Sequence, residues 1–299
     1  MSLLVVGSVA FDSIETPAGR VSEETGGSAT YFSLAASRFT TVRIVAPVGE
    51  DFPEERKAVF SGREIDIGGL HVVPGGRTFR WSGRYEGDMN VAETLETQLN
   101  VLGTFRPELT PSLRATPFVF LANASPANQL SVLEQTPGRR FAMADTMNFW
   151  IESDRAGLLE VLRRVDAIVM NDEEARSLTG ERNLIRAGNR ILDLGPKVAL
   201  VKKGEHGAFL FSTYTFHALP AYPVPEVVDP TGAGDSFAGG VMGYLARAGR
   251  VTIGNLKRGM VYGTVAASFT VEAFGTAALA AASRDDFELR FHEFLHFVS

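Results

Sequence analysis

The chain has 299 residues, of which 45% are hydrophobic and 21% charged; these proportions exclude a disordered chain and are sufficient for one large α/β domain. Its 29 basic and 35 acidic residues give a formal net charge of −6, which argues against a general affinity for nucleic acid. Cysteine is absent from the sequence, so disulfides, thiol nucleophiles and cysteine-ligated zinc are excluded.

The N-terminal residues lack the basic stretch and the extended apolar run of a signal peptide. No apolar run approaches the roughly 20 residues that would span a bilayer. We therefore expect a cytoplasmic protein without a membrane partner. A small anionic ligand is compatible with the acidic balance where helix N-termini and a few cations act locally.

Short apolar segments alternate with helical segments over the first two thirds of the chain. Buried parallel strands have this appearance, and their alternation with helices indicates a wound, mostly parallel sheet. The final third is predicted to be helical. Strands are expected at 3–6, 42–48, 118–121, 141–144, 167–170 and 198–202, and helices at 28–39, 155–165, 185–194, 239–248, 256–270 and 284–297.

Two stretches, at about 11–25 and 70–100, interrupt this alternation and are rich in glycine, threonine and aromatic residues. Within the second, residues 78–85 alternate aromatic with polar or basic side chains, which is typical of a strand with two different faces. We expect these stretches to form a small accessory sheet; a surface hairpin explains the pattern equally well.

The strongest local motif runs from Asp229 to Gly240 and leads into an apolar helix. Its glycines allow successive N–H groups to point at one spot, and the helix adds its positive N-terminal end. Gly232, Ala233 and Gly234 therefore predict an anion hole. Asp235 lies at its rim, where a carboxylate could take a proton from a hydroxyl that attacks phosphorus. A simple aspartate cap after a glycine-rich turn is the alternative.

This motif resembles the C-terminal signature of the ribokinase-like carbohydrate kinases, the PfkB family. Other family motifs occur in the expected order, so that the resemblance covers nearly the whole chain. It implies a three-layer α/β/α sandwich with a mostly parallel central sheet and a small β-sheet lid, formed by residues 1–299 as a single domain. The matching segments are Asp12, Gly26-Gly27, Gly49-Glu50-Asp51, Asn171-Asp172-Glu173-Glu174 and Lys202 to Gly207.

The resemblance also implies roles for the residues around the motif. Asp235 would be the catalytic base, and the amides of Gly232, Ala233 and Gly234 would hold the transferred phosphoryl group. The acceptor would be bound by Asp12 with the backbone of Gly26 and Gly27. Further candidates for the acceptor site are Tyr31, Asn123 and Asp145, the last of which follows an expected strand and so points to the cleft.

ATP and Mg²⁺ are the cofactors that the resemblance implies. Asn171 and Glu174 would help to position Mg²⁺ and phosphate, and Lys202, Gly204 and Gly207 would contact the nucleotide. The adenine pocket would form around Thr264 and the turn at Gly275. Asp229 and the carbonyl of Thr231 match positions at which some members bind a monovalent cation such as K⁺.

Two departures from the family pattern bear on specificity. Many sugar kinases of the family carry asparagine a few residues after the di-glycine, where this chain has Tyr31. The family often has threonine where this chain has Lys202; a lysine there could pair with phosphate, or it could be an exposed cation at a strand end.

Aromatic residues are frequent around the expected acceptor site. Phe11, Tyr31, Phe79, Trp81 and Tyr85 could stack on a nucleobase or a sugar face, or they could pack the accessory sheet or a dimer interface. One apolar lid face is commonly covered by a partner lid in this fold, so we expect a homodimer through the lid.

The resulting expectation is an ATP-dependent kinase that transfers the γ-phosphoryl group to a hydroxyl of a small sugar. A nucleoside kinase that acts on the ribose 5′-hydroxyl is the alternative, and a non-catalytic metabolite-binding protein is a third interpretation. A zinc-protease-like pattern at His292-Glu293-Phe294-Leu295-His296 is better explained by amphipathic packing of the last helix.

Overall fold

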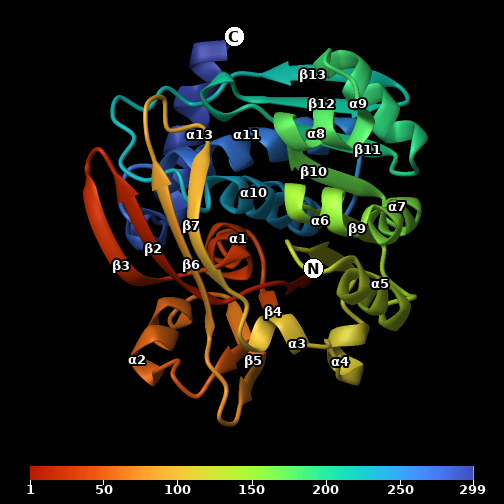
Figure 1. The fold of residues 1–299 in the computed structure, drawn as a ribbon. Coiled ribbons are helices and arrows are strands. Elements are labelled where there is room, and N and C mark those ends of the chain that lie inside the picture. The colour runs from red at the N-terminus through yellow and green to blue at the C-terminus, as the bar shows by residue number, and fades with distance from the viewer. Residues whose placement is uncertain (299) are drawn as a thin grey trace.

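The computed structural model describes residues 1–298 and contains two β-sheets (Figure 1). The larger sheet has nine strands in the order β13-β12-β11-β10-β9-β8-β1-β4-β5. Its strands are parallel from β11 to β5, and β12 and β13 extend it antiparallel. Their bounds are β1 Leu3–Val6, β4 Val42–Gly49, β5 Ile65–Val73, β8 Phe118–Leu121, β9 Phe141–Asp145, β10 Ala167–Asn171, β11 Val198–Lys202, β12 Ala208–Ser212 and β13 Thr215–Leu219.

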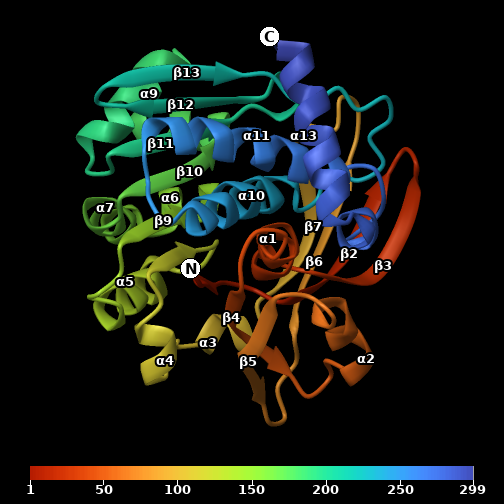
Figure 2. The same cartoon turned by 180° about the vertical axis from the view of Figure 1, so that it is seen from behind.

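Helices cover both faces of this sheet because alternate strand residues point to opposite sides. Leu3 and Val5 of β1 belong to one core cluster, and Leu4 and Val6 belong to the other. Figure 2 shows the face covered by α10 and α11. The helices on that face are α1 Ser28–Ala36, α10 Ala233–Ala248, α11 Ile253–Thr270, α12 Ala277–Ala281 and α13 Arg284–Val298.

The opposite face is covered by a second set of helices, and this arrangement gives the expected α/β/α sandwich. These are α4 Pro111–Arg114, α5 Pro126–Gln135, α6 Asn148–Ser153, α7 Arg155–Arg164, α8 Asp172–Thr179 and α9 Leu184–Asp193. Shorter elements complete the chain: α2 Glu54–Lys57, α3 Val101–Thr104, and the 3-10 turns η1 Ala58–Phe60 and η2 Gly204–His206.

The smaller sheet is the lid, with strand order β3-β2-β6-β7. Its strands are β2 Ala10–Thr16, β3 Gly19–Gly26, β6 Phe79–Tyr85 and β7 Ala92–Gln98. The expected lid segment at 70–100 begins too early, because Leu70 to Val73 pair with β4 as part of β5 in the larger sheet.

The apolar face of the lid is turned toward the body of the protein. Ile14 is buried there, and Tyr85 of the neighbouring strand is nearly so. The other face carries ion pairs of Arg84 with Glu15 and Glu93. The expected homodimer through the lid stays a prediction.

The remaining expectations agree with the structure to within a few residues, with one informative exception. The helix expected at 239–248 begins at Ala233, directly after the glycine-rich motif. Among residues 1–298, no helix is both long and apolar enough to cross a membrane.

Candidate active site

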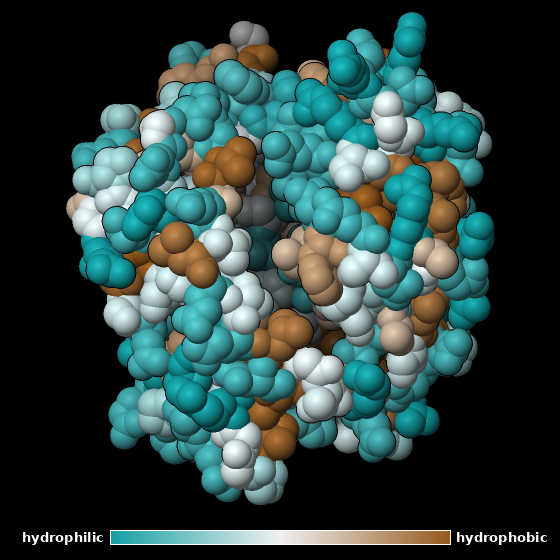
Figure 3. Space-filling model, in the orientation of Figure 1, coloured by the Kyte–Doolittle hydropathy of each residue, from teal (hydrophilic) through white to brown (hydrophobic). Residues whose placement is uncertain are grey.

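Three polar residues terminate neighbouring strands of the large sheet. Asp145, Asn171 and Lys202 are the last residues of β9, β10 and β11, and Asn171 lies directly beside Lys202 in the register. Parallel strands present their carboxyl ends at one edge of a sheet, where ligands bind in open α/β folds. Figure 3 shows a hollow in the surface at this edge, between the lid and α6.

The glycine-rich motif forms the N-terminus of α10 at the same edge. Gly232 caps the helix in a left-handed conformation with φ 76°, which glycine adopts without steric cost. A Cβ at this position would also overlap the ring of Tyr31. The amide of Ala233 donates to the Pro230 carbonyl at 3.2 Å, so it closes the preceding turn. The N–H groups of Gly234 and Asp235 have no acceptor four residues back within the helix and remain available to an anion. The amide of Ser236 already donates to the Gly232 carbonyl at 2.9 Å.

Asp235 lies in the first turn of α10. Burial raises the pKa of its carboxyl to about 7; Asp145 adds to this increase, and Lys202 opposes it. A carboxylate whose pKa lies near neutrality is well matched to remove a proton from a hydroxyl. The structure thus places a carboxyl group of raised pKa and the free amides of a helix N-terminus in one turn.

Asp12 is held against the di-glycine by close backbone packing. Its Oδ2 accepts a hydrogen bond from the Gly27 amide at 3.3 Å, and a Cβ at Gly26 would overlap the same oxygen. Gly27 has φ 93°, so both glycines are required here. Burial raises the pKa of Asp12 to about 7, against the effect of the Gly27 hydrogen bond, and Asp229 and Asp235 raise it further.

Asn171 and Glu174 form a reciprocal capping box at the start of α8. The Glu174 amide donates to Asn171 Oδ1 at 2.8 Å, and Glu174 Oε2 accepts from the Asn171 amide at 2.7 Å. Burial and the charge of Asp145 raise the pKa of Glu174 to about 7, whereas Lys202 lowers it. The box fixes a buried carboxyl group with oxygen atoms of the kind that Mg²⁺ prefers.

Asp229 links the anion-binding loop to the turn that follows α11. Its Oδ1 accepts from the Thr231 amide and its Oδ2 from the Gly275 amide, each at 2.9 Å. The Thr231 hydroxyl donates to Tyr85 of the lid at 3.2 Å. Both carboxylate oxygens thus stabilise backbone turns, and the predicted K⁺ site at Asp229 and Thr231 stays a prediction.

The expected nucleotide turn follows β11. Gly204 and Gly207 both have positive φ, which explains why glycine occurs at both positions. Asn90, at the tip of the lid, donates to Glu205 in this turn at 3.3 Å. Thr264 is buried in α11. The lid and the expected nucleotide turn are therefore in contact, which no sequence pattern indicated.

The motif at 49–51 anchors the lid. Asp51 accepts hydrogen bonds from the amide and hydroxyl of Thr78 at 2.7 Å and pairs with Arg80 at 2.8 Å. These hydrogen bonds and the ion pair with Arg80 lower the pKa of Asp51 against the opposing effect of burial. Arg80 therefore forms an ion pair within the protein at the start of β6.

An apolar rim of exposed side chains follows β9 at the carboxyl-end edge of the large sheet. Asn123 accepts from the Trp150 indole at 3.0 Å and donates to the sulfur of Met147 at 3.0 Å. Phe149 packs edge-on against Trp150 and is 52% exposed, and Met147 is 39% exposed. Of this rim, sequence reasoning selected only Asn123. The signal available was an aromatic pair directly after the strand that ends in Asp145.

The expected aromatic residues do not form one stack. Phe11 points to the opposite lid face from Asp12 and packs on Phe52, with the Arg80 guanidinium 4.9 Å from its ring centre. Trp81 lies across Gly83 of its own strand and donates to Thr94.

Tyr31, like Tyr85, reaches the glycine-rich motif. It is buried against Gly232, and its hydroxyl has no hydrogen-bond partner among residues 1–298. Burial raises its pKa well above the ordinary value, with further increases from Asp12 and Asp229. The neutral phenol is therefore a donor without an acceptor.

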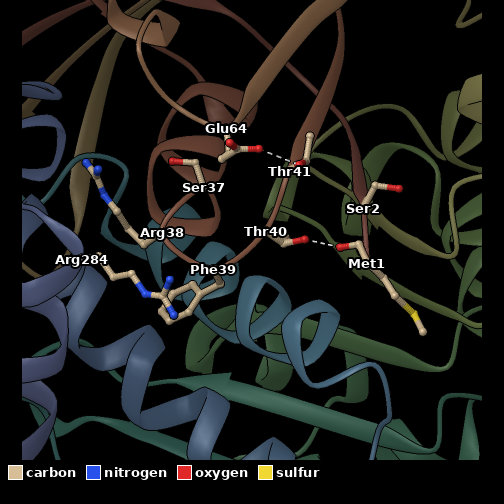
Figure 4. A pocket seen from close by; sticks show the side chains of 9 residues that line it. All are labelled: Met1, Ser2, Ser37, Arg38, Phe39, Thr40, Thr41, Glu64 and Arg284. Carbon is tan, nitrogen blue, oxygen red and sulfur yellow. Dashed lines mark hydrogen bonds between the residues drawn. The ribbon is translucent and has the colours of Figure 1, made fainter.

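A second hollow, of about 560 Å³, lies at the amino ends of the strands, away from these residues (Figure 4). Its Glu64 accepts from Thr41, and its Arg38 donates to the Leu279 and Ala280 carbonyls. These charges are already paired inside the protein. Among residues 1–298, no three histidine, aspartate or glutamate side chains form a metal-binding group.

Comparison with known proteins identifies the family. The chain belongs to the pfkB family of carbohydrate kinases, whose model matches residues 2–282. It is therefore a phosphotransferase with an alcohol group as acceptor, as its sequence motifs predicted.

Individual relatives include kinases of nucleosides and sugars. The chain is 30% identical over 252 residues to a cytidine kinase of Thermococcus kodakarensis, a match that covers 83% of this chain and 89% of the relative. A nucleoside kinase of Methanothermobacter thermautotrophicus is 26% identical over 294 residues, covering 92% and 90%.

Solved structures confirm the ribokinase fold. The nucleoside kinase of Methanocaldococcus jannaschii superposes with a TM-score of 0.77 at 20% identity, over 98% of each chain. A ribokinase of Arabidopsis thaliana, solved with ribose and ATP, gives 0.78 at 19% identity over 97% of this chain and 98% of the other.

Proposed function

We propose that the protein is an ATP-dependent nucleoside kinase that phosphorylates the ribose 5′-hydroxyl. The observation that carries this choice of acceptor is the exposed apolar rim of Met147 and Phe149 beside Asn123. A nucleobase presents a larger planar face than a free sugar, so it would cover more of the Phe149 ring and of Met147. The similarity to a cytidine kinase supports the same choice.

The end of the hollow that holds Gly232 to Asp235, the phosphate end, would carry out the proton and phosphoryl transfer. In its ionised form Asp235 takes the proton of the attacking hydroxyl, and the first-turn amides of α10 face the negative charge of the transferring group. Asp12, held by the Gly27 amide, accepts hydrogen bonds from the ribose hydroxyls. These groups are fixed by backbone packing before the substrates bind, so little reorganisation accompanies the reaction.

The residues also fit ATP with Mg²⁺. Glu174, buried and oriented by its capping box, and Asn171 would hold the metal ion and phosphate oxygens. Gly204 and Gly207 shape the turn beside the nucleotide, and Gly275 and Thr264 the adenine pocket. Bound Mg²⁺ would neutralise part of the phosphate charge.

Tyr31 is the proposed replacement for the asparagine that many sugar kinases of the family carry. Its buried hydroxyl, without a partner among residues 1–298, would donate to a ribose oxygen once the acceptor is bound. That hydrogen bond would remove the cost of an unsatisfied buried donor, roughly 1–3 kcal/mol.

A free-sugar kinase is the second candidate. The cradle of Asp12, Gly26 and Gly27 contacts only hydroxyl groups in this scheme, and it would serve a free pentose or hexose as well. The apolar rim of Met147 and Phe149 is the feature that favours a nucleoside kinase over a free-sugar kinase.

A panel of acceptors separates the two candidates. ADP release from ATP with Mg²⁺ is measured with cytidine, adenosine, inosine, guanosine, ribose and fructose, using Asp235→Asn as the blank. We expect turnover with at least one nucleoside at a kcat/KM at least tenfold above that of ribose. Turnover restricted to free sugars would overturn the nucleoside proposal, and tight ligand binding without turnover would favour a non-catalytic member of the fold.

A further inference from the structure

Lys202 reaches from the end of β11 into the anion-binding turn of α10. A Cβ at Gly234 would lie 2.7 Å from its Nζ atom, so the ammonium group rests against the backbone whose amides face an anion. The side chain is about four-fifths buried, being 19% exposed. A buried cation beside the positive end of a helix is electrostatically unfavourable unless negative charge is close.

Asp145 is the ion-pair partner that supplies this charge in the absence of a ligand. Its Oδ2 lies 3.8 Å from Lys202 Nζ, which is long for a charge-assisted hydrogen bond. The pair is therefore an ionic contact with loose geometry. Burial lowers the pKa of Lys202, but Asp145, Glu174 and Asp235 together raise it above its usual value, so the side chain stays protonated.

Resting on the proposed kinase function, we infer that Lys202 is a catalytic residue that contacts the transferred phosphoryl group, and that Asp145 is an exchangeable counter-ion replaced by the γ-phosphate. The ammonium is close to both the helix end and Asp235, where the charge of the transferring group develops.

The chemical step is balanced by groups already named. The acceptor oxygen forms the new bond to the γ-phosphorus as Asp235 takes its proton. The bond from this phosphorus to the bridging oxygen breaks, and ADP leaves with the electron pair. Lys202 donates a hydrogen bond to a non-bridging oxygen throughout and gains strength as charge accumulates there.

A difference between triphosphate and diphosphate binding tests the inference. Affinities of AMP-PNP and ADP, both with Mg²⁺, are measured by calorimetry for the wild-type protein, Lys202→Met, Asp145→Asn and the double variant. Lys197→Met, which breaks a pair with Asp166 at the other end of the same strand, is the matched control. The double variant removes both buried charges and so avoids an unpaired one, which keeps the test valid if a single variant misfolds.

We expect Lys202→Met and the double variant to lose roughly 10- to 100-fold in affinity for AMP-PNP with little change for ADP. The double variant should retain the wild-type Tm but lose kcat roughly 100-fold or more. Asp145→Asn should bind AMP-PNP more tightly than the wild type, because the counter-ion no longer competes.

Two failures are distinguishable. If the wild-type protein binds AMP-PNP and turns over, yet the double variant keeps its preference for AMP-PNP over ADP and its kcat, Lys202 does not contact the γ-phosphate and the inference is wrong. If the wild-type protein neither binds AMP-PNP nor releases ADP, the proposed function fails and the inference with it.

Discussion

The two ends of the hollow are built in different ways. At the proposed phosphate end, Gly232 and the first turn of α10 present backbone amides, and Asp229 fixes that loop through two backbone hydrogen bonds. At the proposed base-binding rim of the acceptor end, the surface consists of side chains, with Phe149 and Met147 exposed around Asn123. Backbone geometry depends on a few glycines in a short motif, whereas a side-chain surface can change at every position.

This difference suggests how specificity is divided in the molecule. The phosphate end is suited to the part of the reaction that all members of the family share, and the acceptor end to what distinguishes one member from another. Substitutions at the two ends should therefore change different kinetic constants, and the following predictions run from the largest expected effect to the smallest.

Asp235→Asn should lower kcat by roughly 10³-fold, because it removes the base. The fold should be retained, since a neutral amide replaces a carboxyl whose ionisation is disfavoured by burial. ADP release and a thermal melt measure both effects. Asp193→Asn, at an exposed position of α9, is the control, and a near-normal rate for Asp235→Asn would remove this residue from the mechanism.

Gly232→Ala should lower kcat by roughly 10²-fold, because the new methyl group overlaps the Tyr31 ring and shifts the anion-binding turn. Gly62→Ala is a matched control, since Gly62 has φ 70° with no atom within 4 Å of its added Cβ. Both variants should lose roughly 1–2 kcal/mol of stability from the strained backbone. Gly232→Ala should lose more than Gly62→Ala because of its overlap with the buried Tyr31 ring, and only Gly232→Ala should lose activity. Equal kcat values for the two would contradict the proposed anion hole.

The rate and the stability should respond to pH in opposite directions. Asp12 and Asp235 have their pKa raised from 3.8 to about 7 in the folded protein, so their contribution to stability is present below about pH 4 and is lost as pH rises through 7. The ionised Asp235 is needed for turnover, so kcat/KM should increase over this range.

The Asp235→Asn variant isolates this effect on stability. Its Tm relative to the unliganded wild-type protein should rise as pH is raised from 5.5 to 8, measured by calorimetry in buffers of roughly constant ionic strength. A constant difference in Tm, together with a flat rate profile, would show that Asp235 titrates near its ordinary pKa.

Phe149→Ala should raise KM for the nucleoside by roughly 5- to 10-fold with a smaller change in kcat, since it removes about 1 kcal/mol of stacking. Tyr214→Ala, at a turn where the side chain is 91% exposed, is the control. Steady-state kinetics with nucleoside and with ribose provide the comparison. An equal change in KM for both acceptors would assign Phe149 a structural role.

Much of the backbone part of the site, at Gly232 and at the di-glycine beside Asp12, could be predicted from the sequence because its determinants are local. The positive φ of Gly232 and the approach of Asp12 to Gly26 follow from residue types that leave few alternatives. The motif at Asn171 and Glu174 was selected through the resemblance to the family, and the sequence did not indicate that these residues cap α8 reciprocally.

The side-chain packing of the lid and of the apolar rim could not be predicted in the same way. Alternation along 78–85 indicated a strand, but it could not show that Trp81 would lie across Gly83 or that Phe11 would pack on Phe52. Met147 and Trp150 meet Asn123 only because β8 and β9 are adjacent in the sheet. Such contacts depend on tertiary packing, which local patterns do not encode.

The most direct test of the proposed division is the identity of the phosphorylated product. ³¹P NMR and mass spectrometry of the product from equimolar cytidine, adenosine and ribose would identify both the acceptor and the esterified hydroxyl. We expect a nucleoside 5′-monophosphate, with the apolar rim holding the base and Asp235 facing the 5′-hydroxyl. Phosphorylation of ribose alone, or of a nucleoside at a ring hydroxyl, would contradict this arrangement.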